Sequence, residues 1–189
     1  MNSNFTIQDL MTHVDDFPRI PDNTPFYEVI SSLEKSLLDF QTGKSKQRTL
    51  LVEDVDGNIL GKITPKDVIK GLEPQYDKID SFTDNIRYGV PHIVETMKKD
   101  YMLWQKPLDD LCRKAGEIKA ANMITRPGEL QSLNISESMD QAFHLFVTTG
   151  HDSLYVMEDE KIVGLLRFTD IYNAIRGIVQ ACKLDSQDH

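Results

Sequence analysis

Apolar positions change their period along the chain, and the periods predict helices that alternate with strands. Near the start, Phe26, Ile30 and Leu33 recur at spacings of three and four, which is typical of one face of an amphipathic helix. Further on, short apolar runs lie on both sides of Asp56 and Gly57, a dipeptide suited to the tight turn of a β-hairpin. The pattern therefore predicts a mixed α+β chain.

The same order of elements occurs twice. Leu10 aligns with Met123 and Gly61 aligns with Gly164, and the apolar spacing is preserved between these points. Each copy predicts a short β segment, an amphipathic helix, a β-hairpin and a closing helix. The second hairpin turn, around Asp159 and Glu160, lacks a glycine, so its register stays open.

The repeat divides the chain into four parts. We expect a first repeat at 1–73, a helical insertion at 74–119, a second repeat at 120–184 and a disordered tail at 185–189. The insertion is interpreted as extra core or a docking arm because it carries its own apolar stripe. That stripe consists of Phe82, Ile86, Ile93, Met97, Tyr101 and Trp104.

Composition limits the classes of function. Hydrophobic residues make up 40% of the 189 residues and charged residues 27%, which fits a globular protein and excludes a transmembrane or mainly disordered one. The net charge of −9 weighs against nucleic-acid binding, since such a field repels a phosphate backbone. The first ten residues show no pattern of a secretion signal, so a cytoplasmic protein is expected, with no membrane partner.

One motif carries candidate chemistry in both copies. A glycine is followed six residues later by an aspartate that starts a helix, as Gly61 is by Asp67 and Gly164 by Asp170. In the first copy Thr64 ends a strand at a helix N-terminus, where free N–H groups favour a phosphate, and Asp67 can accept hydrogen bonds from ribose hydroxyls. The alternative is a simple helix start, with Thr64 as N-cap and an acid at the third helical position.

The duplicated unit resembles a tandem pair of CBS domains, the Bateman module. The resemblance rests on Met-Thr at residues 11–12, on the run from Thr49 to Gly61, and on the repeated motif that ends in aspartate. It implies two β-α-β-β-α repeats packed through their sheets, with a helical insertion between them. It also implies regulatory adenosine ligands, namely AMP, ADP, ATP or S-adenosylmethionine, in the clefts between the repeats, with no further cofactor.

The resemblance suggests further ligand contacts and also shows two departures. Arg167 stands where the family has Ser or Thr, so the second site is either altered, with a guanidinium contact to phosphate, or empty. Lys62 replaces an aliphatic residue and is either a solvated strand lysine or a phosphate contact. The remaining expected contacts are Thr12, Ile20, Leu50, Leu51 and Tyr155, and for Leu51 and Tyr155 the alternative of a plain core residue is favoured.

The sequence contains no recognisable catalytic apparatus or metal motif. Its five histidines are scattered, it has no Gly-x-Ser-x-Gly elbow and no P-loop, and Asp54 and Asp56 lack the later ligands of a calcium loop. The first hypothesis is therefore a non-catalytic sensor of adenosine compounds that acts on an unidentified effector protein. The alternative is a degenerate CBS scaffold that acts only in protein–protein interaction. In both cases the apolar insertion and the resemblance predict a homodimer.

Overall fold

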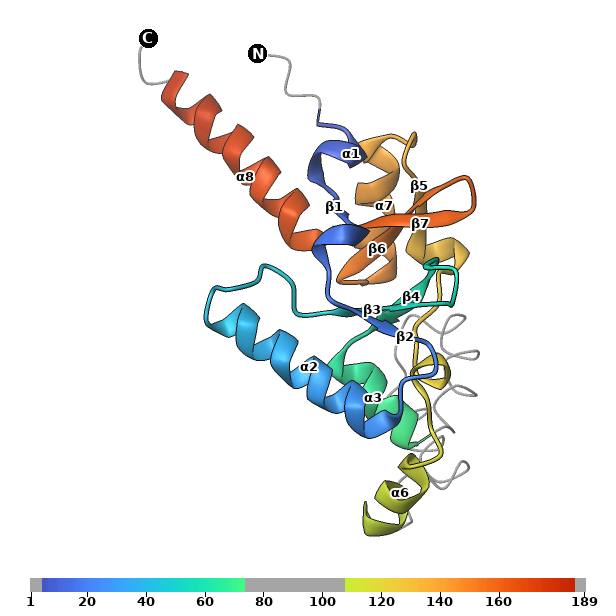
Figure 1. The fold of residues 1–189 in the computed structure, drawn as a ribbon. Helices are drawn as coiled ribbons and strands as arrows, with labels where there is room; N and C mark the ends of the chain where they lie inside the picture. Colours follow the sequence, from blue (N-terminus) through green and yellow to red (C-terminus); the bar gives the residue numbers. More distant parts are fainter. Residues whose placement is uncertain (1–4, 74–107, 186–189) are drawn as a thin grey trace, which may run out of the picture. The chain divides into compact units, whose positions relative to one another are not determined.

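The computed structural model describes residues 5–73 and 108–185 (Figure 1). Within these ranges the chain is a mixed α+β structure with two sheets, which confirms the predicted fold class. The apolar stripe of the expected insertion lies outside the described residues, as do residues 186–189 of the expected tail.

The chain forms two compact units. Unit A comprises Pro18–Asp56 and Lys62–Thr125, and unit B comprises the segment through Phe17, Gly57–Gly61 and the chain from Arg126 onward. Neither unit is a continuous stretch of sequence. The boundaries of the units therefore differ from those of the sequence repeats.

Unit A contains most of a three-stranded sheet of order β2-β3-β4, since only Lys62 and Ile63 of β4 are grouped with this unit. Strand β2 runs parallel to β3, with Ile20 opposite Val52, because helix α2 supplies the crossover between them. The elements are β2 (Arg19–Pro21), α2 (Phe26–Gln41), β3 (Leu50–Glu53), β4 (Ile59–Ile63), α3 (Pro65–Leu72) and α6 (Leu108–Ala115), followed by a 3-10 turn at Ala120–Asn122. The core cluster of the unit consists of Ile20, Phe26, Val29, Leu33, Leu50, Val52, Ile63, Ala115, Ala120 and Met123, and Val68 and Leu72 of α3 pack against it.

Unit B contains a four-stranded sheet of order β1-β7-β6-β5. Its β5-α7-β6-β7-α8 segment follows the same order as β2-α2-β3-β4-α3, as the repeat predicts. The elements are α1 (Ile7–Leu10), β1 (Thr12–His13), β5 (Ser132–Asn134), α7 (Met139–Thr149), β6 (Ser153–Glu158), β7 (Lys161–Arg167) and α8 (Phe168–Asp185), with 3-10 turns at Val14–Asp16 and Glu129–Gln131. Its core cluster consists of Ile7, Leu133, Ala142, Leu145, Phe146, Leu154, Val156, Leu166 and Ile171.

The two hairpins reach their tight turns by different residues. In the first, Gly57 has φ +80° and the Asp56 N–H donates to Asp54 Oδ1 at 2.9 Å, which makes Asp54 a turn residue. In the second, Glu158 lies opposite Lys161, so Asp159 and Glu160 form a two-residue loop with φ +45° and +64°. This left-handed pair fixes the register that the sequence leaves open.

The leading segments of the two repeats are exchanged. Thr12 pairs with Leu165 of β7 in unit B, although Thr12 begins the first repeat. Thr125, its equivalent in the second repeat, forms a bridge with Lys62 in unit A through reciprocal backbone bonds of 3.1 and 3.3 Å. Because Leu165 and Lys62 are also equivalent positions, both exchanges have the same register.

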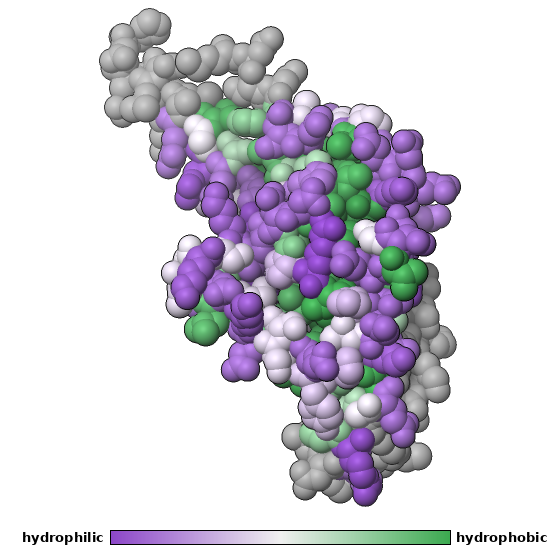
Figure 2. Space-filling model, viewed as in Figure 1, coloured by the Kyte–Doolittle hydropathy of each residue, from purple (hydrophilic) through white to green (hydrophobic). Residues whose placement is uncertain are grey.

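The face shown in Figure 2 is largely hydrophilic, with separate apolar patches among the polar residues. In the ranges that the structure describes, no helix combines the length and the apolar character needed to cross a membrane.

Candidate ligand-binding site

The first motif is a closed cap on a helix N-terminus. Thr64 follows β4 with extended backbone angles, and helix α3 begins at the next residue, Pro65. One oxygen of Asp67, Oδ2, accepts from the Thr64 backbone N–H at 2.8 Å and from the Thr64 hydroxyl at 2.5 Å. The four residues from Thr64 to Asp67 therefore cap the helix, as one interpretation predicted. They also lie at a helix N-terminus, which favours a phosphate.

The second oxygen of Asp67 has a partner that the sequence analysis missed. Thr125 donates its hydroxyl to Asp67 Oδ1 at 2.6 Å across 58 positions of sequence. The carboxylate is only 4% exposed, so all three hydrogen bonds lie in a largely desolvated site. The alignment of Thr125 with Thr12 was the signal that could have indicated this residue.

The other expected contacts in unit A are all buried. Lys62 is 6% exposed, so it is not the solvated strand lysine that one interpretation gave. Its backbone holds Thr125, which places Lys62, Thr125 and Asp67 in one connected group. Ile20 and Leu50 belong to the apolar core cluster of the unit, and Leu51 is fully buried.

The second motif has a different internal partner. Arg167 ends β7 and donates from Nε to Asp170 Oδ2 at 2.7 Å and from Nη2 to Asp170 Oδ1 at 2.9 Å. This bidentate pair engages both carboxylate oxygens, and the side chains are 29% and 22% exposed. Asp170 is thus held by a cation where Asp67 is held by two hydroxyls.

The two remaining sequence candidates lie in one row of the unit B sheet. Thr12 pairs with Leu165, and Leu165 pairs with Tyr155, which is fully buried. Among the described residues, no hydrogen bond joins Thr12 to Asp170, although the equivalent bond joins Thr125 to Asp67.

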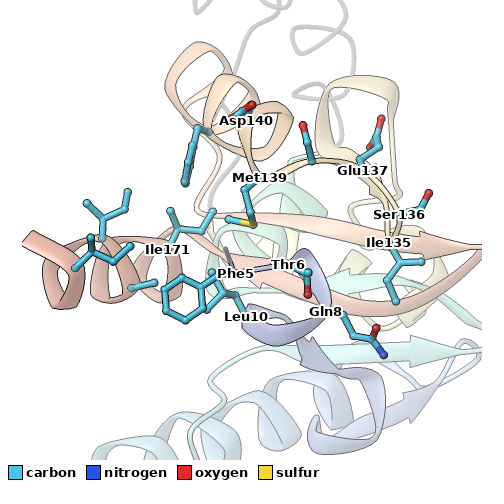
Figure 3. Close-up of a pocket in the computed structure, with 15 residues that line it drawn as sticks. Phe5, Thr6, Gln8, Leu10, Ile135, Ser136, Glu137, Met139, Asp140 and Ile171 are labelled. Carbon is cyan, nitrogen blue, oxygen red and sulfur yellow. The ribbon is translucent and has the colours of Figure 1, made fainter. Parts of the chain in front are cut away.

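A separate cavity of about 680 Å³ lies on the helical side of unit B. Figure 3 shows apolar side chains of α1, α7 and α8 around it, with the carboxylates of Glu137 and Asp140 also on its wall. Beside it, Asp9 accepts hydrogen bonds from the backbone and then the side chain of Thr6, and these bonds lower the pKa of the Asp9 carboxyl. None of the ten residues indicated by the sequence lines this cavity.

In chemical terms, the first motif offers a recessed carboxylate beside a helix N-terminus and a buried lysine. A carboxylate accepts hydrogen bonds from a diol, and the first turn of a helix favours an anion. These two preferences match a ribose phosphate. The second motif offers a guanidinium that is already neutralised by Asp170.

Comparisons with known proteins agree with this interpretation of the fold. The family model for the CBS domain matches residues 116–177. No curated protein sequence matches the chain. Residues 116–177 are thus similar to a CBS domain, and the chain has the fold of CBS-domain proteins, as the sequence predicts.

Three solved structures illustrate the likeness. A CBS domain-containing protein of unknown function from Bacillus anthracis str. Ames Ancestor is 13% identical, with a TM-score of 0.57 over 92% of this chain and 94% of that one. CBSX2 in complex with AMP is 16% identical, with a TM-score of 0.54 over 94% and 98%. CbpB in complex with c-di-AMP is 11% identical, with a TM-score of 0.54 over 96% and 91%.

Proposed function

We propose that this chain is a non-catalytic regulatory protein that binds an adenosine nucleotide at its first motif. The observation that carries the proposal is the recessed Asp67 carboxylate at the N-terminus of α3, in the place where the duplicated motif lies. Two proteins of the same fold are described in complex with AMP and with c-di-AMP, which supports a nucleotide as the ligand class. AMP, ADP, ATP, c-di-AMP and S-adenosylmethionine are the compounds to compare.

The two motifs should bind unequally. Asp67 is held by neutral hydroxyl groups that a ligand hydroxyl can replace, whereas a ligand at Asp170 must compete with a bidentate guanidinium. We therefore assign the stronger site to Thr64 and Asp67, with the buried Lys62 as the candidate cation for a phosphate. Such a contact would make binding weaken as salt rises.

Calorimetric titration of each nucleotide into the wild type, Asp67→Ala and Asp170→Ala tests the assignment. Asp67→Ala removes charge-assisted hydrogen bonds worth roughly 1.5–3 kcal/mol, a loss of about tenfold or more in affinity. Asp67→Asn keeps an acceptor oxygen, and thermal melts of all variants separate lost binding from lost folding. A greater loss from Asp170→Ala would reverse the assignment.

One observation favours a second candidate function, a scaffold without ligand. Both carboxylates have internal partners, as capping and ion pairing alone would require. If none of the titrated compounds binds the wild type below millimolar concentration, the sensor proposal fails and the scaffold takes its place. In either role we propose a cytoplasmic homodimer that acts on an effector protein.

A further inference from the structure

Thr125 lies at the point where the chain passes from one compact unit to the other. It is the last residue of unit A, and Arg126 begins the long C-terminal segment of unit B. The attachments of Thr125 to unit A include the backbone bridge to Lys62 and the hydroxyl bond to Asp67. We call the passage from Thr125 to Arg126, where the chain leaves unit A for unit B, the chain crossing. The Asp67 carboxylate of the candidate site therefore also holds the chain crossing.

The acceptor capacity of Asp67 brings these two roles into conflict. A carboxylate oxygen has two lone pairs, and both positions of Oδ2 are used by Thr64. Thr125 takes one of the two positions on Oδ1. A vicinal diol that donates both its hydroxyls needs two positions, and only one remains. The hydroxyl of Thr125 is the partner that belongs to another segment of the chain, and its departure leaves the capping bonds of α3 in place.

We propose that a bound ribose displaces the Thr125 hydroxyl from Asp67 and so loosens the chain crossing at Thr125 and Arg126. This inference rests on the proposed function. It makes Thr125 a positioning residue that couples ligand occupancy to the connection between the units. The coupling belongs to one motif only, because the equivalent Thr12 has no bond to Asp170 in the described residues.

Amide hydrogen exchange of the wild type, with and without saturating AMP, is the direct test. The Thr125 N–H donates to the Lys62 carbonyl at 3.1 Å, and the Lys62 N–H donates back at 3.3 Å. If AMP releases Thr125, both amides should exchange about two- to tenfold faster, as expected for the loss of one hydrogen bond. Amides of β6 and β7 serve as internal references.

The variant Thr125→Val removes the hydroxyl and keeps the shape of the side chain. Without ligand, its amides at 62 and 125 should already exchange as fast as those of the AMP-bound wild type, and AMP should change them no further. Its affinity for AMP should rise about two- to tenfold, because the internal competitor is gone. Thr125→Ser retains a hydroxyl and should behave as wild type, and Thr42→Val, which removes an exposed hydroxyl at the end of α2, controls for the substitution itself.

The outcomes separate this inference from the proposed function. Binding of AMP with unchanged or slower exchange at Thr125 overturns the release and leaves the sensor proposal standing. Weaker binding by Thr125→Val also overturns it, because Thr125 would then support the bound state. If none of the titrated compounds binds the wild type below millimolar concentration, both proposals fail together. Normal ligand-free exchange in Thr125→Val shows by itself that the hydroxyl does not hold the crossing.

Discussion

Asp67 and Asp170 occupy the same position of the repeat, yet their neighbours give them different chemistry. A hydroxyl three residues earlier leaves Asp67 a carboxylate with one acceptor position unused. At the equivalent position of the second repeat, the Arg167 guanidinium forms an ion pair with Asp170 and neutralises its charge. A single residue difference, Thr64 against Arg167, thus determines which motif resembles a diol-binding site.

The substitution Arg167→Thr should open the second motif. It removes the ion pair, provides a hydroxyl at the helix start and leaves Asp170 able to accept a diol. Calorimetry should show the number of nucleotides bound per chain rising from one to two, without change at the first site. Arg167→Lys keeps the charge but not the planar fork, and is the matched control. Two nucleotides per chain in the wild type, or one in Arg167→Thr, would contradict the prediction.

Helices and strands were predicted well where the spacing of apolar residues was clear, and less well where a hairpin turn had no glycine. The spacing of Phe26, Ile30 and Leu33 predicted an amphipathic helix, which the structure has at Phe26–Gln41, and Asp56-Gly57 predicted the first hairpin. The second turn was uncertain because the left-handed conformation of Asp159 and Glu160 is imposed by strand pairing and not by residue preference.

The second turn therefore carries strain that a substitution can relieve. Glu160 has φ +64°, where a residue with a Cβ is disfavoured by about 1 kcal/mol or more. Glu160→Gly should raise the free energy of unfolding, by somewhat less than about 1 kcal/mol because glycine also gains freedom in the unfolded chain. Urea unfolding measures the change. Lys161→Gly, one residue further and inside β7, should lower stability instead.

At the scale of the whole molecule, the repeat could be found in the sequence but the exchange of its leading segments could not. Alignment of the two repeats shows that Thr12 and Thr125 are equivalent, but it does not indicate which sheet each residue joins. The bond between Thr125 and Asp67 spans 58 positions and depends on that exchange. This hydrogen-bonded group could therefore be predicted only in part from the sequence: Thr64 and Asp67 were candidates, and Thr125 was not.

Helix α8 now supplies a described surface for the predicted homodimer. Four apolar residues recur along it at spacings of four, three and four, and each is 42–55% exposed: Phe168, Tyr172, Ile175 and Val179. Such a stripe is the pattern of a helix that packs against a partner. We expect light scattering at tens of micromolar to give twice the 21.6 kDa mass of one chain.

The double variant Tyr172→Glu with Ile175→Glu should shift this mass to that of a monomer, because two carboxylates would be buried without partners at the centre of the stripe. Asn173→Glu adds a charge to the same helix off the stripe, at a residue that is also exposed, and should leave the dimer intact. A monomeric wild type would contradict the homodimer itself. A dimeric double variant would instead place the contact on another surface, because the charge at α8 would then have met no partner.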